Sequence, residues 1–72
     1  MKRRLETEES AVSLAISVIT KKFKVQTNSI QNLETKYDDD SWDWDVALGW
    51  KDKKAVIRMD SVQAKILEIN EI

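Results

Sequence analysis

Seventy-two residues make one domain, with no room for a second hydrophobic core. Charged side chains make up 35% of the chain, and their charges nearly cancel to a formal net charge of −1, which is typical of an ordinary soluble surface. The chain lacks the surplus of basic residues that nucleic-acid binding favours. The chain has no cysteine and no histidine, so disulfides, thiol nucleophiles, thiolate metal sites and the usual proton shuttle are excluded.

The N-terminus resembles the start of a signal peptide only in its first four residues, Met1-Lys2-Arg3-Arg4. Acidic residues follow at once, and serines interrupt the apolar run between Ala11 and Ile19. We therefore expect a disordered segment at residues 1–6, a single domain at residues 7–72, and neither a cleavable signal nor a membrane span. A cytoplasmic protein is the default, although a secreted protein whose leader had been removed would look the same.

The segment from Thr7 to about Lys22 is predicted to form a helix. Thr7 is a suitable N-cap, and the two glutamates after it place negative charge where the helix dipole favours it. Four large apolar residues recur at helical spacing, flanked by alanines that leave space for a bulky partner surface. These four are Val12, Ile16, Ile19 and Phe23.

A weaker pattern predicts an edge strand from Ser29 to Tyr37, after a turn at Thr27-Asn28-Ser29. Leu33 and Tyr37 are expected to lie on one face of this strand, because they are an even number of residues apart. The polar run Asp38–Ser41 then forms a hairpin loop that leads into the next strand.

The segment Trp42–Trp50 is the clearest strand of the chain. Large apolar residues occupy every second position, so one face is expected to carry all three tryptophans and to pack inward. The five residues predicted on this inner face are Trp42, Trp44, Val46, Leu48 and Trp50.

Two further strands complete the predicted sheet. After a hairpin loop at Lys51–Lys54, the inward positions are Ala55, Ile57 and Met59, and the outward ones are Val56, Arg58 and Asp60. After a turn at Ser61–Ala64, the fourth strand carries Ile66, Leu67 and Ile69. The expected fold class is therefore α+β, with one N-terminal helix packed on a three- to four-stranded antiparallel meander sheet.

The C-terminal pattern of a strand followed by Asp60-Ser61-Val62-Gln63-Ala64-Lys65-Ile66 resembles the PepSY domain, which typically has a strand and then Asp-Ala-x-Thr-Gly-x-(Ile/Val). The helix start at Thr7–Val12 is also similar to the acidic opening of that family. The sequence departs from the motif where Gln63 replaces the threonine and Ala64 replaces the turn glycine. The resemblance implies a helix-plus-sheet module that binds or inhibits a peptidase and has no chemistry of its own. A weaker likeness is to gas-vesicle accessory proteins, which have a helix before a W-x-V-x-V strand.

Function is expected to depend on the side of the sheet that the helix leaves uncovered. The predicted strands place Val56, Ile30 and Ile66 or Leu67 there. The charged residues expected beside them are Asp43, Asp45, Arg58 and Glu68. The leading hypothesis is a small non-catalytic protein-interaction module, with a protein partner or a second copy docked on this side or on an edge strand. The small size of the domain favours a homodimer. The candidate partner-binding residues are Trp42, Trp50, Val56, Arg58 and Ile66.

Other classes of function match the sequence less well. Exposed Trp42 and Trp50 at the strand ends could form a stacking platform for a ligand or single-stranded nucleic acid, but the nearby aspartates would repel phosphate. The acidic run Asp38–Asp45 could attract calcium, yet the loop glycine and the bidentate glutamate of a calcium loop are missing. Six serines have no histidine to activate them. We expect no enzyme, no cofactor and no metal.

Overall fold

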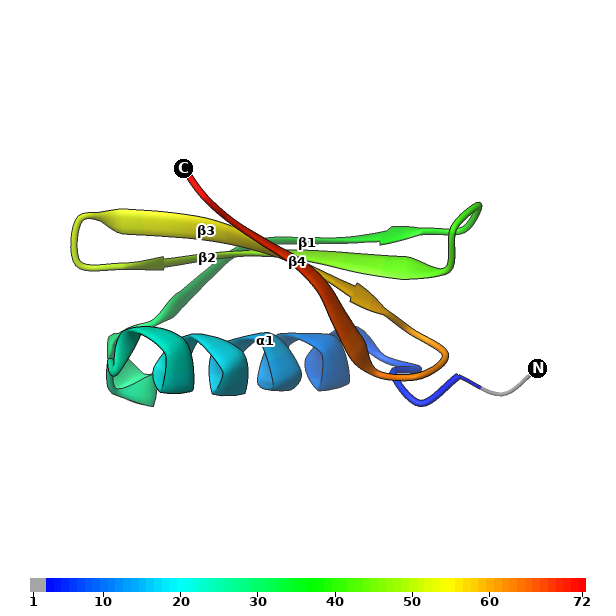
Figure 1. The fold of residues 1–72 in the computed structure, drawn as a ribbon, viewed down its shortest axis with the longest axis horizontal. Coiled ribbons are helices and arrows are strands. Elements are labelled where there is room, and N and C mark those ends of the chain that lie inside the picture. Colours follow the sequence, from blue (N-terminus) through cyan, green and yellow to red (C-terminus); the bar gives the residue numbers. More distant parts are fainter. Residues whose placement is uncertain (1–2) are drawn as a thin grey trace.

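The computed structural model describes residues 3–72 as one helix beside a four-stranded antiparallel sheet (Figure 1). The strands follow one another across the sheet in chain order, and the helix covers one side. This arrangement confirms the predicted α+β fold. The elements are α1 (Glu8–Phe23), a single 3₁₀ turn η1 (Thr27–Ser29), β1 (Gln31–Asp38), β2 (Asp43–Trp50), β3 (Lys53–Asp60) and β4 (Lys65–Glu71).

The start of α1 confirms the predicted N-cap. The backbone N–H of Ser10 donates to Thr7 Oγ1 at 3.1 Å, and the backbone N–H of Thr7 donates to Ser10 Oγ at 3.3 Å. These reciprocal bonds satisfy two donors that the first helical turn would otherwise leave free. The helix ends where Lys24 adopts a left-handed conformation with φ of 56°.

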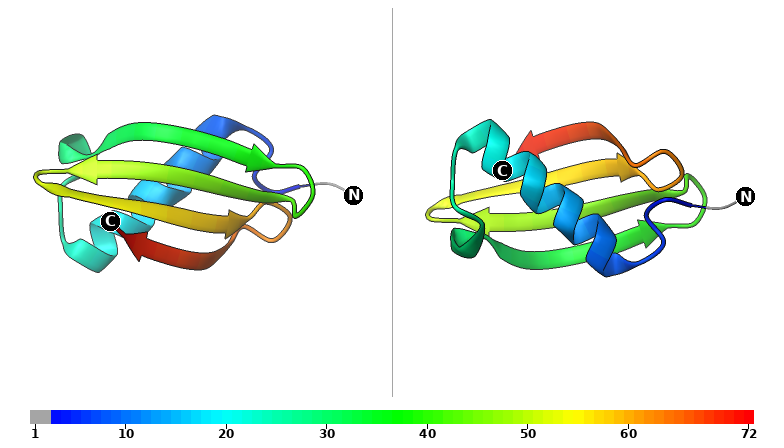
Figure 2. Two further views of the ribbon diagram at one scale, coloured as in Figure 1. Left: turned by 90° about the horizontal axis from the view of Figure 1, so that it is seen from above. Right: turned by 90° about the horizontal axis from the view of Figure 1, so that it is seen from below.

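Small residues bring α1 close to the sheet. Ala11, Ala15 and Ile19 are completely buried along the centre of the contact, whereas Val12 and Phe23 lie half-buried at its sides. The helix crosses the sheet diagonally, from the β1 edge at its N-terminus to the β4 edge at its C-terminus (Figure 2). The core therefore forms beneath this diagonal, where β2 and β3 contribute their inward side chains. Those side chains are Trp44, Val46, Leu48, Trp50, Ala55, Ile57 and Met59.

The alternation predicts that all three tryptophans lie on one face of a strand, but only two of them do. Trp44 and Trp50 are buried and stack at tilted angles on Tyr37 and Phe23, with ring centroids 4.9 and 5.0 Å apart. Trp42 instead lies in the β1–β2 loop, because β2 begins only at Asp43, and 39% of its surface is exposed. The expectation that Trp42 belongs to the inner face is wrong.

The segment before the helix is part of the core, which the prediction of a disordered tail at residues 1–6 missed. Leu5 is buried, its N–H donates to the carbonyl of Ser61, and its carbonyl accepts a 2.9 Å bond from Trp44 Nε1. Arg3 lies over the ring of Tyr37, 4.8 Å from its centroid. Only residues 1 and 2 of that predicted tail lie outside the described part of the chain.

Both outer strands contain a β-bulge, and the bulge in β1 corrects a prediction about strand faces. An irregularity between Asn32 and Glu34 makes Leu33 an extra residue in β1, so Leu33 lies over Gly49 on the side away from the helix, whereas Tyr37 packs inward. The predicted placement of Leu33 and Tyr37 on one face is therefore wrong. The strand also begins at Gln31, because residues 27–29 form the 3₁₀ turn.

Candidate interaction face

The side of the sheet opposite α1 is covered by no element of residues 3–72, and we call it the open face (Figure 2). Strand register arranges its side chains in rows that run across all four strands. The alternating row consists of Lys36, Asp45, Arg58 and Glu68. The apolar-centred row consists of Glu34, Ala47, Val56 and Asn70. The acidic row consists of Asp38, Asp43, Asp60 and Lys65.

Arg58 is the centre of charge on the open face. Its Nε lies 3.4 Å from carboxylate oxygens of both Asp43 and Asp45, and its Nη2 lies 3.6 Å from Asp38 Oδ2. One guanidinium thus serves three carboxylates, so this end of the face is negative. Nε is shielded from solvent and has no hydrogen-bond partner within residues 3–72. The Arg58 side chain as a whole is 37% exposed, so atoms other than Nε remain accessible to another molecule.

Asp38 is held in its ionised form by the loop that follows it. The backbone N–H of Asp40 donates to Asp38 Oδ1 at 3.0 Å. This bond lowers the pKa of Asp38 below its ordinary value of 3.8, with further contributions from Ser41 and from the charge of Arg58. The negative charge beside Arg58 is therefore present at neutral pH.

The middle of the open face is small and apolar. Ala47 and Val56 are directly opposed on β2 and β3, and Leu33 lies over Gly49 next to them. A shallow depression of about 210 Å³ is lined here by Glu34, Lys36, Asp45, Ala47 and Val56. A flat surface with a small apolar centre and charged surroundings suits contact with another protein better than enclosure of a small molecule.

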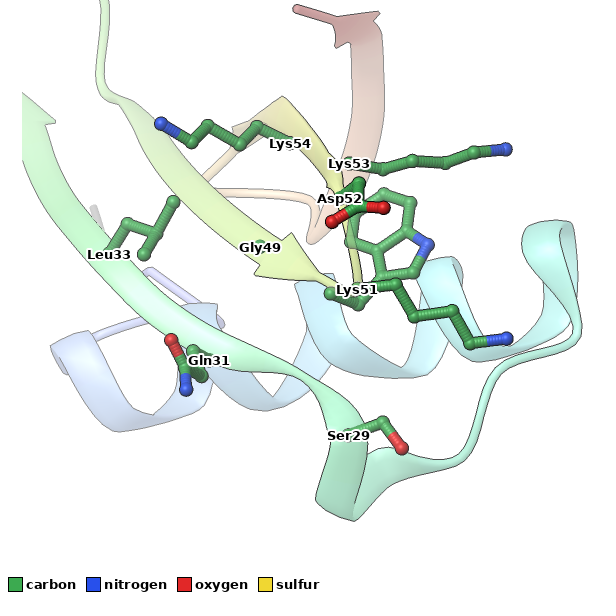
Figure 3. A pocket seen from close by; sticks show the side chains of 9 residues that line it. Ser29, Gln31, Leu33, Gly49, Lys51, Asp52, Lys53 and Lys54 are labelled. Atoms are coloured by element: carbon green, nitrogen blue, oxygen red, sulfur yellow. The ribbon is translucent and has the colours of Figure 1, made fainter.

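The β2–β3 hairpin borders a second depression, of about 240 Å³, which extends to Ser29 in η1 and to Gln31 and Leu33 on β1 (Figure 3). Three lysines surround it, but they do not converge. Lys54 extends to the side on which Leu33 lies, whereas Lys51 and Lys53 extend the other way. An anion in this depression would therefore not be held by several ammonium groups at once.

The edges of the sheet are poorly suited to strand addition. Leu67 is the extra residue of a bulge in β4, just as Leu33 is in β1, and the two are 49% and 47% exposed. Bulges interrupt the ladder of backbone donors and acceptors that an added strand would need. Of the two docking routes expected from the sequence, the geometry favours the open face over the edges.

The five candidate partner-binding residues do not form one site. Val56 and Arg58 are two residues apart on β3, so both lie on the open face, as expected. Ile66 was placed wrongly, because the β4 bulge directs it toward Met59 and the core. Trp50 is only 3% exposed and offers no surface to a partner, whereas Trp42 lies in the loop at the acidic end. Ile30, also expected on the open face, packs against the core.

Lys36 lies on the open face although the sequence did not indicate it, whereas Glu68 lies there as expected; neither was among the candidate partner-binding residues. Both are exposed, and each is directly opposed to a charged residue of the adjoining central strand. Their sign pattern would have been visible only once the register of all four strands was known. The loop aspartates form no group of three or more ligands suited to a metal ion within residues 3–72.

No protein-family model, curated protein or solved structure matches the chain. The part of the chain that the structure describes contains no helix long and apolar enough to cross a membrane. The class that fold and site define is thus a small α+β domain with an uncovered, charge-patterned sheet face.

Proposed function

We propose that this chain is a non-catalytic protein-interaction module that binds another folded protein through the open face. The observation that carries the proposal is the open face itself, where an apolar centre at Ala47 and Val56 adjoins a row of paired charges. Charges in register give a contact its orientation, and the apolar centre gives it area to bury.

Two features of the structure support binding at this face. The Arg58 side chain is 37% exposed, so a carboxylate of a partner can pair with the accessible part of its guanidinium. The bulged edge strands leave the face as the larger regular surface. The chain also lacks the histidine and cysteine side chains on which most protein catalysts of this size would depend.

The PepSY resemblance gives this proposal a candidate partner, a peptidase. The left-handed conformation of Ala64, with φ of 55°, supports the resemblance, because the glycine at that position of the family motif favours the same backbone conformation. Gas-vesicle assembly is the alternative setting that the weaker likeness implies.

A binding site for an aromatic ligand at Trp42 is the second candidate function. Trp42 is 39% exposed, and its backbone has a φ of 62°, a conformation that bulky residues rarely adopt. Because Trp50 is buried, however, Trp42 would have to act without a second tryptophan, next to the acidic loop.

Site-specific photo-crosslinking tests the first proposal. A benzophenone amino acid at Val56 should give a discrete adduct in the cells that make the protein, whereas the same group at Ser17, exposed on the helix, should not. Adduct mass minus the 8.4 kDa of this chain identifies the partner. Absence of any adduct from Val56, or equal adducts from both positions, would contradict the proposal.

A further inference from the structure

We propose that the occupant of the open face is a second copy of this chain, bound face to face about a two-fold axis that runs parallel to the strands between β2 and β3. This inference rests on the proposed function, because it names the partner of the same surface. The observation behind it is the sign pattern of the alternating row. In strand order its charges read plus, minus, plus, minus, at Lys36, Asp45, Arg58 and Glu68.

A two-fold rotation about this axis turns the open face over and exchanges β1 with β4 and β2 with β3. The row of the second copy is then read in reverse, as minus, plus, minus, plus. Each Arg58 meets Asp45 of the other copy, and each Lys36 meets Glu68 of the other copy. All four positions of the row are complementary, which is the self-complementarity that a two-fold interface requires.

The neighbouring rows fit the same rotation. In the apolar-centred row, Ala47 meets Val56 of the other copy, so the centre of the contact is apolar. In the acidic row, Asp38 meets Lys65 of the other copy, whereas Asp43 meets Asp60, a repulsion that is reduced by the ion pair of Asp43 with Arg58 of its own copy. Because twisted sheets pack at about −30°, positions near the centre of the face make closer contact than positions near its corners.

The other two-fold axis available to stacked sheets, perpendicular to the strands, gives a poorer match. It would place the alternating row on the apolar-centred row, so that Asp45 meets Ala47 and Arg58 meets Val56 of the other copy. Charged groups would then lose water without gaining a partner, which is costly. The charge pattern therefore selects the axis parallel to the strands.

The size of the face sets the strength of the contact. Four strands about 4.8 Å apart and eight residues long, at about 3.3 Å per residue, span roughly 500 Å² in projection. A specific interface of standard size buries about 800 Å² on each partner, and transient ones bury less. We therefore expect a reversible dimer whose population depends on concentration and falls with added salt.

Sedimentation equilibrium with charge-reversed variants tests this arrangement. The wild-type protein should rise with concentration from 8.4 kDa toward twice that mass. Lys36→Glu and Glu68→Lys, both at exposed positions, should each weaken the dimer about tenfold, because each reversal affects two symmetry-related pairs. An equimolar mixture of the two variants restores all four complementary contacts and should dimerise as strongly as the wild type.

Matched controls carry the same charge changes away from the open face. Lys21→Glu on α1 and Glu71→Lys, whose register partner Ala55 faces the core, should dimerise like the wild type. Far-UV circular dichroism confirms that each variant is folded. A dimer that is indifferent to Lys36→Glu and Glu68→Lys, or a mixture that stays as weak as its components, would overturn the arrangement.

The two proposals fail in different ways. A wild-type protein that remains at 8.4 kDa up to about 1 mM would refute self-association, since that concentration corresponds to only about −4 kcal/mol of binding. If Val56 then still crosslinks to a heavier protein, the interaction module stands with a different partner. If Val56 crosslinks to nothing, both proposals fail.

Discussion

The β2–β3 hairpin contains a backbone strain that a single substitution should relieve. Lys51 and Asp52 form a two-residue loop between the paired residues Trp50 and Lys53, and Lys51 has a φ of 52°. The left-handed region costs a residue with a Cβ atom about 1–2 kcal/mol of conformational free energy, whereas glycine adopts this region freely. Glycine at the first position of a two-residue loop is also a preferred hairpin sequence.

Lys51→Gly should therefore stabilise the domain by about 0.5–1 kcal/mol. The relief of about 1–2 kcal/mol is reduced by the greater freedom of glycine in the unfolded chain, about 0.4–1 kcal/mol. The Lys51 side chain is exposed and forms no ion pair within residues 3–72, so no contact is lost. For a domain of this length the melting temperature should rise by about 2–8 °C.

Thermal and urea unfolding, followed by circular dichroism, measure this effect. Lys51→Ala removes the same charge but keeps the Cβ atom, so it separates backbone strain from repulsion among the neighbouring lysines. Asp52→Gly is the second control, because the φ of Asp52 is not positive and glycine there should only destabilise. If Lys51→Gly is no more stable than Lys51→Ala, or if both glycine variants lose stability alike, the turn stores no strain at Lys51.

Ser61, Trp42 and Asp38 each make a contact or have an exposure that can be tested separately. Ser61 is completely buried, and its Oγ donates to the Trp42 carbonyl at 2.6 Å. Ser61→Ala should therefore lower the free energy of unfolding in urea by about 1 kcal/mol. An unchanged unfolding midpoint would argue against a role for this bond. Iodide should quench only the Trp42 part of the tryptophan fluorescence, and Trp42→Phe should leave an emission that resists iodide; quenching of that variant would show that the other indoles are not dry. Because the pKa of Asp38 is lower in the folded state, its ionised form adds stability above pH 3.8 that is lost as the pH falls through the folded pKa. Asp38→Asn should therefore be less stable than the wild type at pH 6, with a difference that disappears at low pH, and a difference independent of pH would contradict the assignment.

Local patterns were sufficient to predict most of the fold. The helix begins at the predicted cap, Thr7, and the period-two alternation identified the buried sides of β2 and β3. These features depend on short-range rules, namely the hydrogen bonds that a helix start requires and the opposite directions of successive strand side chains. Both rules can be applied to the chain without knowing which segments lie next to one another.

The errors arose where pairing between distant segments decides the outcome. Leu33 and Leu67 are extra residues of bulges, which exist only relative to the partner strand and shift every later side chain by one position. Trp42 continues the alternation in sequence, but the four-residue loop that ends there holds it out of β2. Leu5 contacts Ser61 and Trp44, two residues far away in the chain, and no local pattern indicates this.

The site was harder to predict than the fold for the same reason. Val56 and Arg58 were placed on the open face from one strand alone, whereas the alternating row exists only when four strands are in register. The bulge at Leu67 places Glu68 opposite Arg58, since without it Leu67 would hold that position. Lys36 lies between the β1 bulge and the β1–β2 loop, and the loop sets its pairing with Asp45. The bulge of β4 thus both interrupts that edge and completes the charge pattern of the face.

The strained turns connect stability with association. Residues other than glycine hold positive φ at Lys24, Trp42, Lys51 and Ala64, at the end of the helix and in all three strand connections. At about 1–2 kcal/mol each, these four conformations oppose folding by an amount comparable to the total stability of a small domain, about 5–15 kcal/mol. A partner that binds only the folded state adds stability by mass action. The strain in the turns does not change this increment, but it lowers the stability to which the increment is added, so binding at the open face makes a larger difference to the folded fraction of this domain than to that of a relaxed one.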